Sequence, residues 1–123
     1  MRFEPPVHWL SRVAVRDAEF HGQKVAKGEA VYTVLGAANR DPEHYDDPDT
    51  FRLDRPRSDH HTFGHGIHFC IGAPLARMEA HHALLGMLRR FSRIEHVLDA
   101  ENERTHSSML RGYHHLWLRL ASN

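Results

Sequence analysis

The chain has 123 residues, enough for one modest domain, and its 16 basic and 16 acidic side chains leave no formal net charge. This balance argues against nucleic acid or an anionic membrane surface as a partner. The longest apolar stretch, residues 30–38, is too short to cross a bilayer, and the first six residues lack the apolar core of a secretory signal. We therefore expect a soluble, cytoplasmic protein.

Short strands and turns are expected in the first third of the chain. Residues 7–15 mix β-branched, aromatic and small side chains without a helical period, which favours a strand. Residues 19–25 predict a tight hairpin centred on Gly22, where a positive φ costs little. A turn at residues 26–29 then leads into a mostly buried strand over residues 30–35, followed by a short helical turn through Asn39.

Residues 40–58 have no periodic pattern and contain three prolines. Each proline forces extended geometry on the residue before it and excludes a long helix; the three steps are Asp41-Pro42, Asp47-Pro48 and Arg55-Pro56. The segment is therefore predicted to be a surface loop. Its length is typical of a loop that has a function or that wraps around a neighbour.

One long helix is predicted from Pro74 to Phe91. Proline is favoured in a first helical turn, and the apolar residues that follow recur on one helical face; they are Leu75, Met78, Leu85, Leu88 and Phe91. Two strands are expected after it, near residues 94–97 and 113–120. Strands, loops and a single long helix together indicate the α+β class.

The segment between the loop and the helix, residues 63–77, carries the chemistry. It contains Cys70, the only cysteine of the chain, which is therefore either an unreactive residue of the core or a reactive group. Glycines around it let the backbone pass close to a flat ligand, and the helix that starts just after it favours the thiolate form. A haem iron requires such a rigidly held, shielded thiolate. His68 and Arg77 supply donors for the haem propionates, and Phe63 can pack on the sulfur side.

Residues 63–77 read Phe-Gly-His-Gly-Ile-His-Phe-Cys-Ile-Gly-Ala-Pro-Leu-Ala-Arg. This string resembles the haem-ligand signature of the cytochrome P-450 family, Phe-Gly-x-Gly-x-His-x-Cys-x-Gly-x-x-Leu-Ala-Arg, at every fixed position. The resemblance implies that residues 1–123 are the C-terminal haem-ligand portion of the mainly α P-450 fold, without its N-terminal two-thirds. It implies haem b (iron protoporphyrin IX), with Cys70 as iron ligand. The implied haem-binding set is Arg12, Phe63, Gly64, His68, Cys70, Gly72 and Ala76.

The resemblance covers essentially the whole chain and has two departures. Arg2 would be the arginine of the family's Glu-x-x-Arg motif, but the chain begins after the position of that glutamate. Thr50 stands in the meander, residues 47–55, where the family usually has an arginine. Arg52 and Arg55 are both candidates for its replacement. Arg12 matches the arginine that reaches a haem propionate.

The reaction that the resemblance implies is a monooxygenation, in which one oxygen atom of O₂ enters a small organic substrate. Electrons would come from a ferredoxin- or flavoprotein-type donor. The family's long central helix and most of its substrate-recognition segments have no counterpart here. No catalytic residue beyond the haem ligand is therefore expected, and the isolated chain is expected to be inactive or to need a complementing N-terminal part.

Two non-enzymatic alternatives stay open on the sequence. One is a haem-binding or interaction module without catalysis. The other is a histidine-rich metal binder, since the chain has 13 histidines and His61, His65 and His68 lie four and three residues apart.

Overall fold

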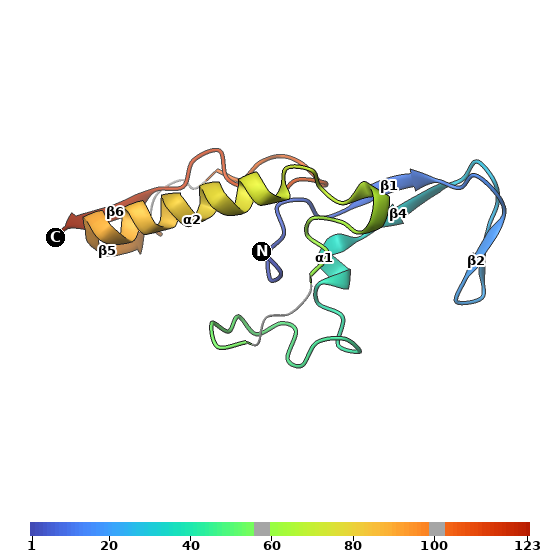
Figure 1. Ribbon diagram of the computed structural model, residues 1–123, viewed down its shortest axis with the longest axis horizontal. Coiled ribbons are helices and arrows are strands. Elements are labelled where there is room, and N and C mark those ends of the chain that lie inside the picture. The colour runs from blue at the N-terminus through green and yellow to red at the C-terminus, as the bar shows by residue number, and fades with distance from the viewer. Residues whose placement is uncertain (56–59, 99–102) are drawn as a thin grey trace. The chain divides into compact units, whose positions relative to one another are not determined.

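The computed structural model describes residues 1–55, 60–98 and 103–123 (Figure 1). The chain forms two compact units, one of residues 1–62 with 107–111 and one of residues 63–106 with 112–123. The end of the predicted surface loop, residues 56–58, lies outside the described residues. Among those that are described, no helix combines the length and the apolar character needed to span a membrane.

The first unit contains two antiparallel strand pairs. β1 (Leu10–Val13) pairs with β4 (Ala30–Thr33), so that Leu10 lies opposite Thr33. β2 (Ala18–Phe20) and β3 (Gln23–Val25) form the predicted hairpin. Its two turn residues, His21 and Gly22, have φ of 49° and 81°, as a two-residue hairpin turn requires.

α1 (Leu35–Ala38) begins where the sequence predicted the end of a strand. β4 stops at Thr33, and Leu35 instead becomes the first helical residue, with only 7% of its surface exposed. The helical turn buries this leucine and lets its carbonyl accept the N–H of Asn39 at 3.0 Å. The expectation of a mostly buried strand was also wrong, because only two strands pair here and Tyr32 is 59% exposed.

The second unit holds the cysteine loop, the long helix and the last strand pair. α2 (Ala73–Arg90) confirms the predicted helix and begins beside a proline in its first turn. It passes directly into β5 (Phe91–His96), which pairs antiparallel with β6 (Leu118–Ser122). In Figure 1 this strand pair lies beside the last turns of α2. β5 begins earlier than predicted, because Phe91 is already extended, with φ −121° and ψ 127°. β6 ends later than predicted, because Ser122 pairs with Phe91.

The apolar stripe of α2 is only partly covered by the described part of this chain, because Leu85 and Phe91 are half-buried and the other three residues are exposed. Leu75 and Met78 are each 53% exposed and Leu88 is 66% exposed, whereas Ala73 is fully buried. A soluble domain normally covers such a stripe with its own core. The helix therefore has the pattern of a core helix without the core that would cover it.

Candidate functional site

The cysteine loop closes on itself through backbone hydrogen bonds. The N–H of Cys70 donates to the carbonyl of Phe63 at 2.8 Å, which joins the two ends of the loop. Inside it, a short 3-10 turn, η1 (Gly66–His68), is closed by the N–H of Phe69 donating to the Gly66 carbonyl at 3.0 Å. The Cys70 carbonyl accepts the N–H of Ala73 at 3.1 Å, so the loop leads straight into α2.

Two glycines of the loop adopt backbone conformations that other residues rarely take. Gly64 and Gly66 have φ of 74° and 64°. A Cβ at Gly64 would lie 3.3 Å from the His68 carbonyl oxygen, tighter than most real contacts, whereas a Cβ at Gly66 would meet open space. At Gly72 a Cβ would lie 3.8 Å from the Cys70 sulfur, an ordinary contact distance.

The thiol of Cys70 is exposed at the start of an 18-residue helix. Within the described residues, the backbone N–H groups of Ile71 and Gly72 form no hydrogen bond. Free N–H groups and the positive end of a helix dipole both stabilise a thiolate. Two apolar residues close to the cysteine in the sequence are exposed as well: Ile67 is 97% and Ile71 is 100% exposed. An exposed thiol on a glycine-rich, apolar loop fits a flat, largely apolar haem.

Phe63 is the buried anchor of the loop. Its side chain is 8% exposed, and the guanidinium carbon of Arg77 lies 4.6 Å from its ring centroid. The ring of Phe69 lies 6.3 Å away and tilted. Arg77 lies over Phe63 in a cation–π contact one helical turn into α2. Its predicted contact with a haem propionate stays a prediction. Ala76, half-buried in the same turn, donates its N–H to the Gly72 carbonyl at 2.9 Å.

The other two residues predicted to hold propionates, His68 and Arg12, are both exposed. The His68 side chain forms no hydrogen bond or ion pair with the described residues, which leaves its ring nitrogens available. Arg12 lies on β1 in the first unit, where its Nη1 donates to the Ser11 carbonyl at 2.8 Å. Its contact with a propionate remains a prediction.

A second polar cluster in the first unit surrounds Arg2, which is 9% exposed. Its guanidinium donates to the Asn39 carbonyl at 2.6 Å and to the Pro48 carbonyl at 3.0 Å, and its Cζ lies 4.9 Å from the ring centroid of Tyr45. Burial lowers the pKa of Arg2, and the positive charge of Arg55 lowers it further.

Arg55, and not Arg52, is the arginine close to Arg2. Its guanidinium donates to three backbone carbonyls, those of Asp46 just before the meander and of Asp47 and Thr50 within it. Its buried Nε has no hydrogen-bond partner among the described residues. Arg52 forms only a local ion pair with Asp54, at 3.0 Å. The structure therefore favours Arg55 as the replacement for the family's meander arginine.

Sequence reasoning missed two residues that organise this cluster. Asn39 is fully buried and bonded through both ends of its side-chain amide. Arg40 donates to the Phe3 carbonyl at 2.8 Å and pairs with Glu4 and Asp49 at 3.1 and 3.0 Å. The available signal was an asparagine directly after a short helical turn, a position where it often ends a helix.

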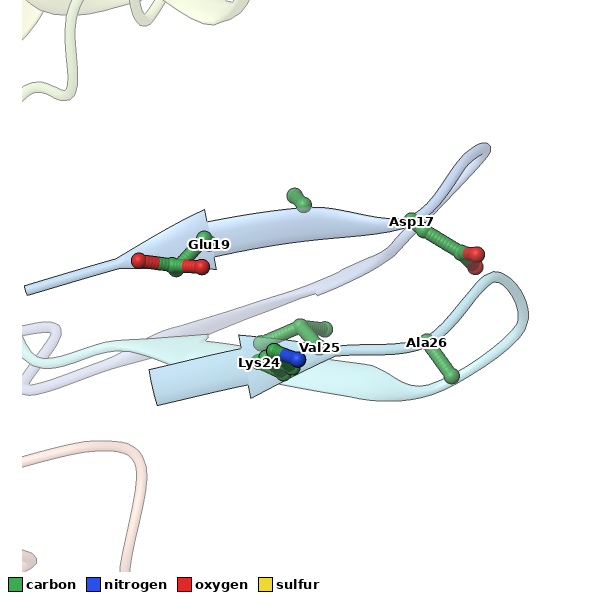
Figure 2. A pocket seen from close by; sticks show the side chains of 6 residues that line it. Asp17, Glu19, Lys24, Val25 and Ala26 are labelled. Carbon is green, nitrogen blue, oxygen red and sulfur yellow. The ribbon is translucent and has the colours of Figure 1, made fainter. Parts of the chain in front are cut away.

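The structure gives no support to a histidine-rich metal site. Across residues 1–55, 60–98 and 103–123, no three or more His, Cys, Asp or Glu side chains gather closely enough to hold a metal ion. A surface hollow of about 500 Å³ lies along the β2–β3 hairpin, between side chains such as Glu19 and Lys24 (Figure 2). None of the predicted haem-binding residues lines it.

Comparisons with known proteins agree with the loop geometry. The family model described as cytochrome P450 matches residues 1–112. Cytochrome P450 109 of Bacillus spizizenii is 45% identical over 95 residues, which are 77% of this chain and 24% of that protein. CYP199A2 of Rhodopseudomonas palustris is 38% identical over 120 residues, covering 98% of this chain and 29% of that protein.

Solved structures of cytochromes P450 have the same fold over nearly the whole of this chain. Substrate-free CYP109E1 of Bacillus megaterium superposes with a TM-score of 0.94 at 36% identity, over 99% of this chain and 32% of that one. A thermophilic cytochrome P450 of Sulfolobus tokodaii gives 0.92 at 40% identity, over 99% and 32%. The chain thus spans about a third or less of the relatives it matches. By its fold, its ligand loop and these matches, the chain belongs to the cytochrome P450 family, whose cofactor is haem.

Proposed function

We propose that residues 1–123 form the haem-ligand portion of a monooxygenase, with haem b bound through the thiolate of Cys70. The observation that carries this proposal is the closed glycine loop, which presents an exposed thiol beside free N–H groups at the start of α2. When bound, the haem supplies the activation of O₂, which a thiolate ligand favours by donating electron density.

The chain's own residues would hold the cofactor. The closed loop fixes the sulfur, because the Cys70 N–H is tied to the Phe63 carbonyl at 2.8 Å. Gly64, Gly72 and Ala76 keep the backbone free of bulky side chains where a flat ring must approach. His68 and Arg12 would donate to the propionates, an assignment supported by the free imidazole of His68.

The substrate and the electron donor are proposed from the family resemblance and not from residues of this chain. We propose a small organic substrate and a ferredoxin- or flavoprotein-type donor, in a cytoplasmic protein. The wall of the pocket opposite Cys70 would come from a further stretch of polypeptide, and the exposed apolar side chains of α2 agree with such a covering segment. The family structures do not point to one kind of ligand, because CYP109E1 was solved in complex with testosterone and P450BioI in complex with an acyl carrier protein carrying hexadec-9Z-enoic acid.

The proposal is tested by titrating hemin into the purified chain and into Cys70→Ser, with absorption and isothermal calorimetry as readouts. His68→Gln serves as a control that leaves the iron ligand intact. The proposal predicts one saturable site whose ferric spectrum shows thiolate ligation in the unmodified chain and in His68→Gln. A spectrum and affinity that Cys70→Ser does not change would overturn it.

A further inference from the structure

Asn39 is the largest fully buried side chain of the described residues, at 0% exposure. Its backbone ends α1, donating to the Leu35 carbonyl at 3.0 Å and accepting from Arg2 at 2.6 Å. Its side-chain Oδ1 accepts the N–H of His61 at 2.7 Å, and its Nδ2 donates to Oγ1 of Thr62 at 3.0 Å. A buried amide that uses both of its ends fixes its partners strongly.

These two partners immediately precede the cysteine loop. Thr62 is 7% exposed and is held from a second side, because its hydroxyl also donates to the Met1 carbonyl at 3.2 Å. The next residue along the chain is Phe63, whose carbonyl accepts the Cys70 N–H at 2.8 Å. A short covalent and hydrogen-bonded path therefore runs from the Asn39 amide to the backbone of the cysteine.

Removing the Asn39 amide would take from the buried Thr62 hydroxyl the group that donates to it, and from the part-buried His61 N–H the oxygen that accepts its hydrogen bond. Buried polar groups without partners are expensive, so the segment would shift or open toward water to regain hydrogen bonds. Opening at Thr62 moves Phe63 through the peptide bond, and with it the carbonyl to which Cys70 is tied. The loss of rigidity should be greatest in the cysteine loop, because both side-chain hydrogen bonds of Asn39 go to the residues just before it.

We propose that Asn39 is a positioning residue for the cysteine-ligand loop. By its hydrogen bonds to His61 and Thr62, which together form a clamp, it fixes the start of the loop, and so it determines how rigidly Cys70 would be held as an iron ligand. The inference rests on the proposed haem-binding function only for its consequence at the iron, since the clamp itself exists without haem.

The clamp is tested first in the chain without haem, by NMR-detected hydrogen exchange of backbone amides. Asn39→Ala is compared with Asn123→Ala, because Asn123 also donates a side-chain hydrogen bond, to the Arg89 carbonyl at 2.7 Å. Asn39→Ala is expected to speed exchange of the Cys70 N–H at least about tenfold, equivalent to about 1.4 kcal/mol. The N–H of Thr105, bonded to the Gly112 carbonyl at 3.1 Å in the same unit, is expected to stay unchanged.

Two results would overturn the proposal. One is an unchanged Cys70 exchange rate in Asn39→Ala. The other is an equal acceleration at Cys70 and Thr105, which would mean a general loss of stability. If Asn39→Ala does not fold, Thr62→Val and Thr62→Ser replace it: valine removes the hydroxyl and serine keeps it. Faster Cys70 exchange in the valine variant, with rescue by serine, supports the clamp, and equal rates in the two refute it.

The consequence at the iron has its own readout. In the reduced CO complex, Asn39→Ala is expected to lower the fraction with a thiolate-type Soret band, whereas Asn123→Ala keeps that fraction. An unmodified chain without Cys70-dependent haem binding would defeat the proposed function, and the exchange experiment would still decide the role of Asn39. A thiolate fraction that is equal in the unmodified chain and in Asn39→Ala would contradict the inference alone.

Discussion

Alanine at Gly64 tests whether the loop is as tightly closed as the structure shows. Two effects add at this position. An L-residue at a φ of 74° costs about 1–2 kcal/mol. The new Cβ would also lie 3.3 Å from the His68 carbonyl oxygen, and forcing atoms into a packed site costs about 1–3 kcal/mol.

Gly66 supplies a matched control in the same loop. Its φ of 64° gives alanine the same backbone strain, but a Cβ there meets nothing within 4 Å. We expect Gly66→Ala to lower the free energy of unfolding by about 1–2 kcal/mol. Gly64→Ala should lower it by about 1 kcal/mol more than that, because of the contact with the His68 carbonyl.

The assay is urea unfolding of the second unit. Trp117 belongs to this unit and Trp9 to the other, so both glycine variants are made in a Trp9→Phe background and followed by Trp117 fluorescence. An unchanged denaturant slope ensures that the comparison concerns stability alone. If Gly64→Ala is no more destabilising than Gly66→Ala, the His68 carbonyl is not held where the structure places it, and the argument for a rigid loop fails.

Three further predictions concern arginines. Arg2→Met should destabilise the first unit by about 2–3 kcal/mol in urea unfolding followed by Trp9 fluorescence, because buried carbonyls lose a charged donor; a loss no larger than that of an exposed arginine would contradict this. The hydrogen bond from Arg52 holds the pKa of Asp54 below its ordinary value of 3.8, so Arg52→Ala should raise that pKa in an NMR titration. The stability from this pair is present above the ordinary pKa and lost as the pH falls through the lowered one; an unchanged pKa would refute the pairing. Arg77→Met removes the cation over Phe63, the buried anchor of the loop, so the loop should loosen and the Cys70 thiol should react faster with a disulfide reagent. Arg77→Lys should speed the reaction less, because the lysine keeps a cation over the ring; equal rates in the two variants would argue against the contact.

The sequence was most informative where structure depends on neighbouring residues. Gly22 sits in the turn of the predicted hairpin, and Pro74 lies in the first turn of the predicted helix, because turn and helix-start preferences are local. The glycines of the cysteine loop were also identified in advance, since few residues tolerate their backbone angles.

Features that depend on distant residues could not be predicted in this way. The bonds from Asn39 to Thr62 and from Arg2 to Asn39 span 23 and 37 residues. No local pattern encodes them. The choice between Arg52 and Arg55 was open for the same reason, because it depends on where the meander carbonyls lie. Leu35 was placed in a strand because its apolar side chain fits either element, and only the folded chain shows that a helical turn buries it.

The central claim is that Cys70 is the thiolate ligand of a haem iron. The most direct measurement is the absorption spectrum of the reduced CO complex, recorded for the hemin-loaded chain beside Cys70→Ser. The account predicts a strongly red-shifted Soret band in the unmodified chain and its loss in the serine variant. A Soret band of the same position in both proteins would contradict the assignment of Cys70 as the iron ligand.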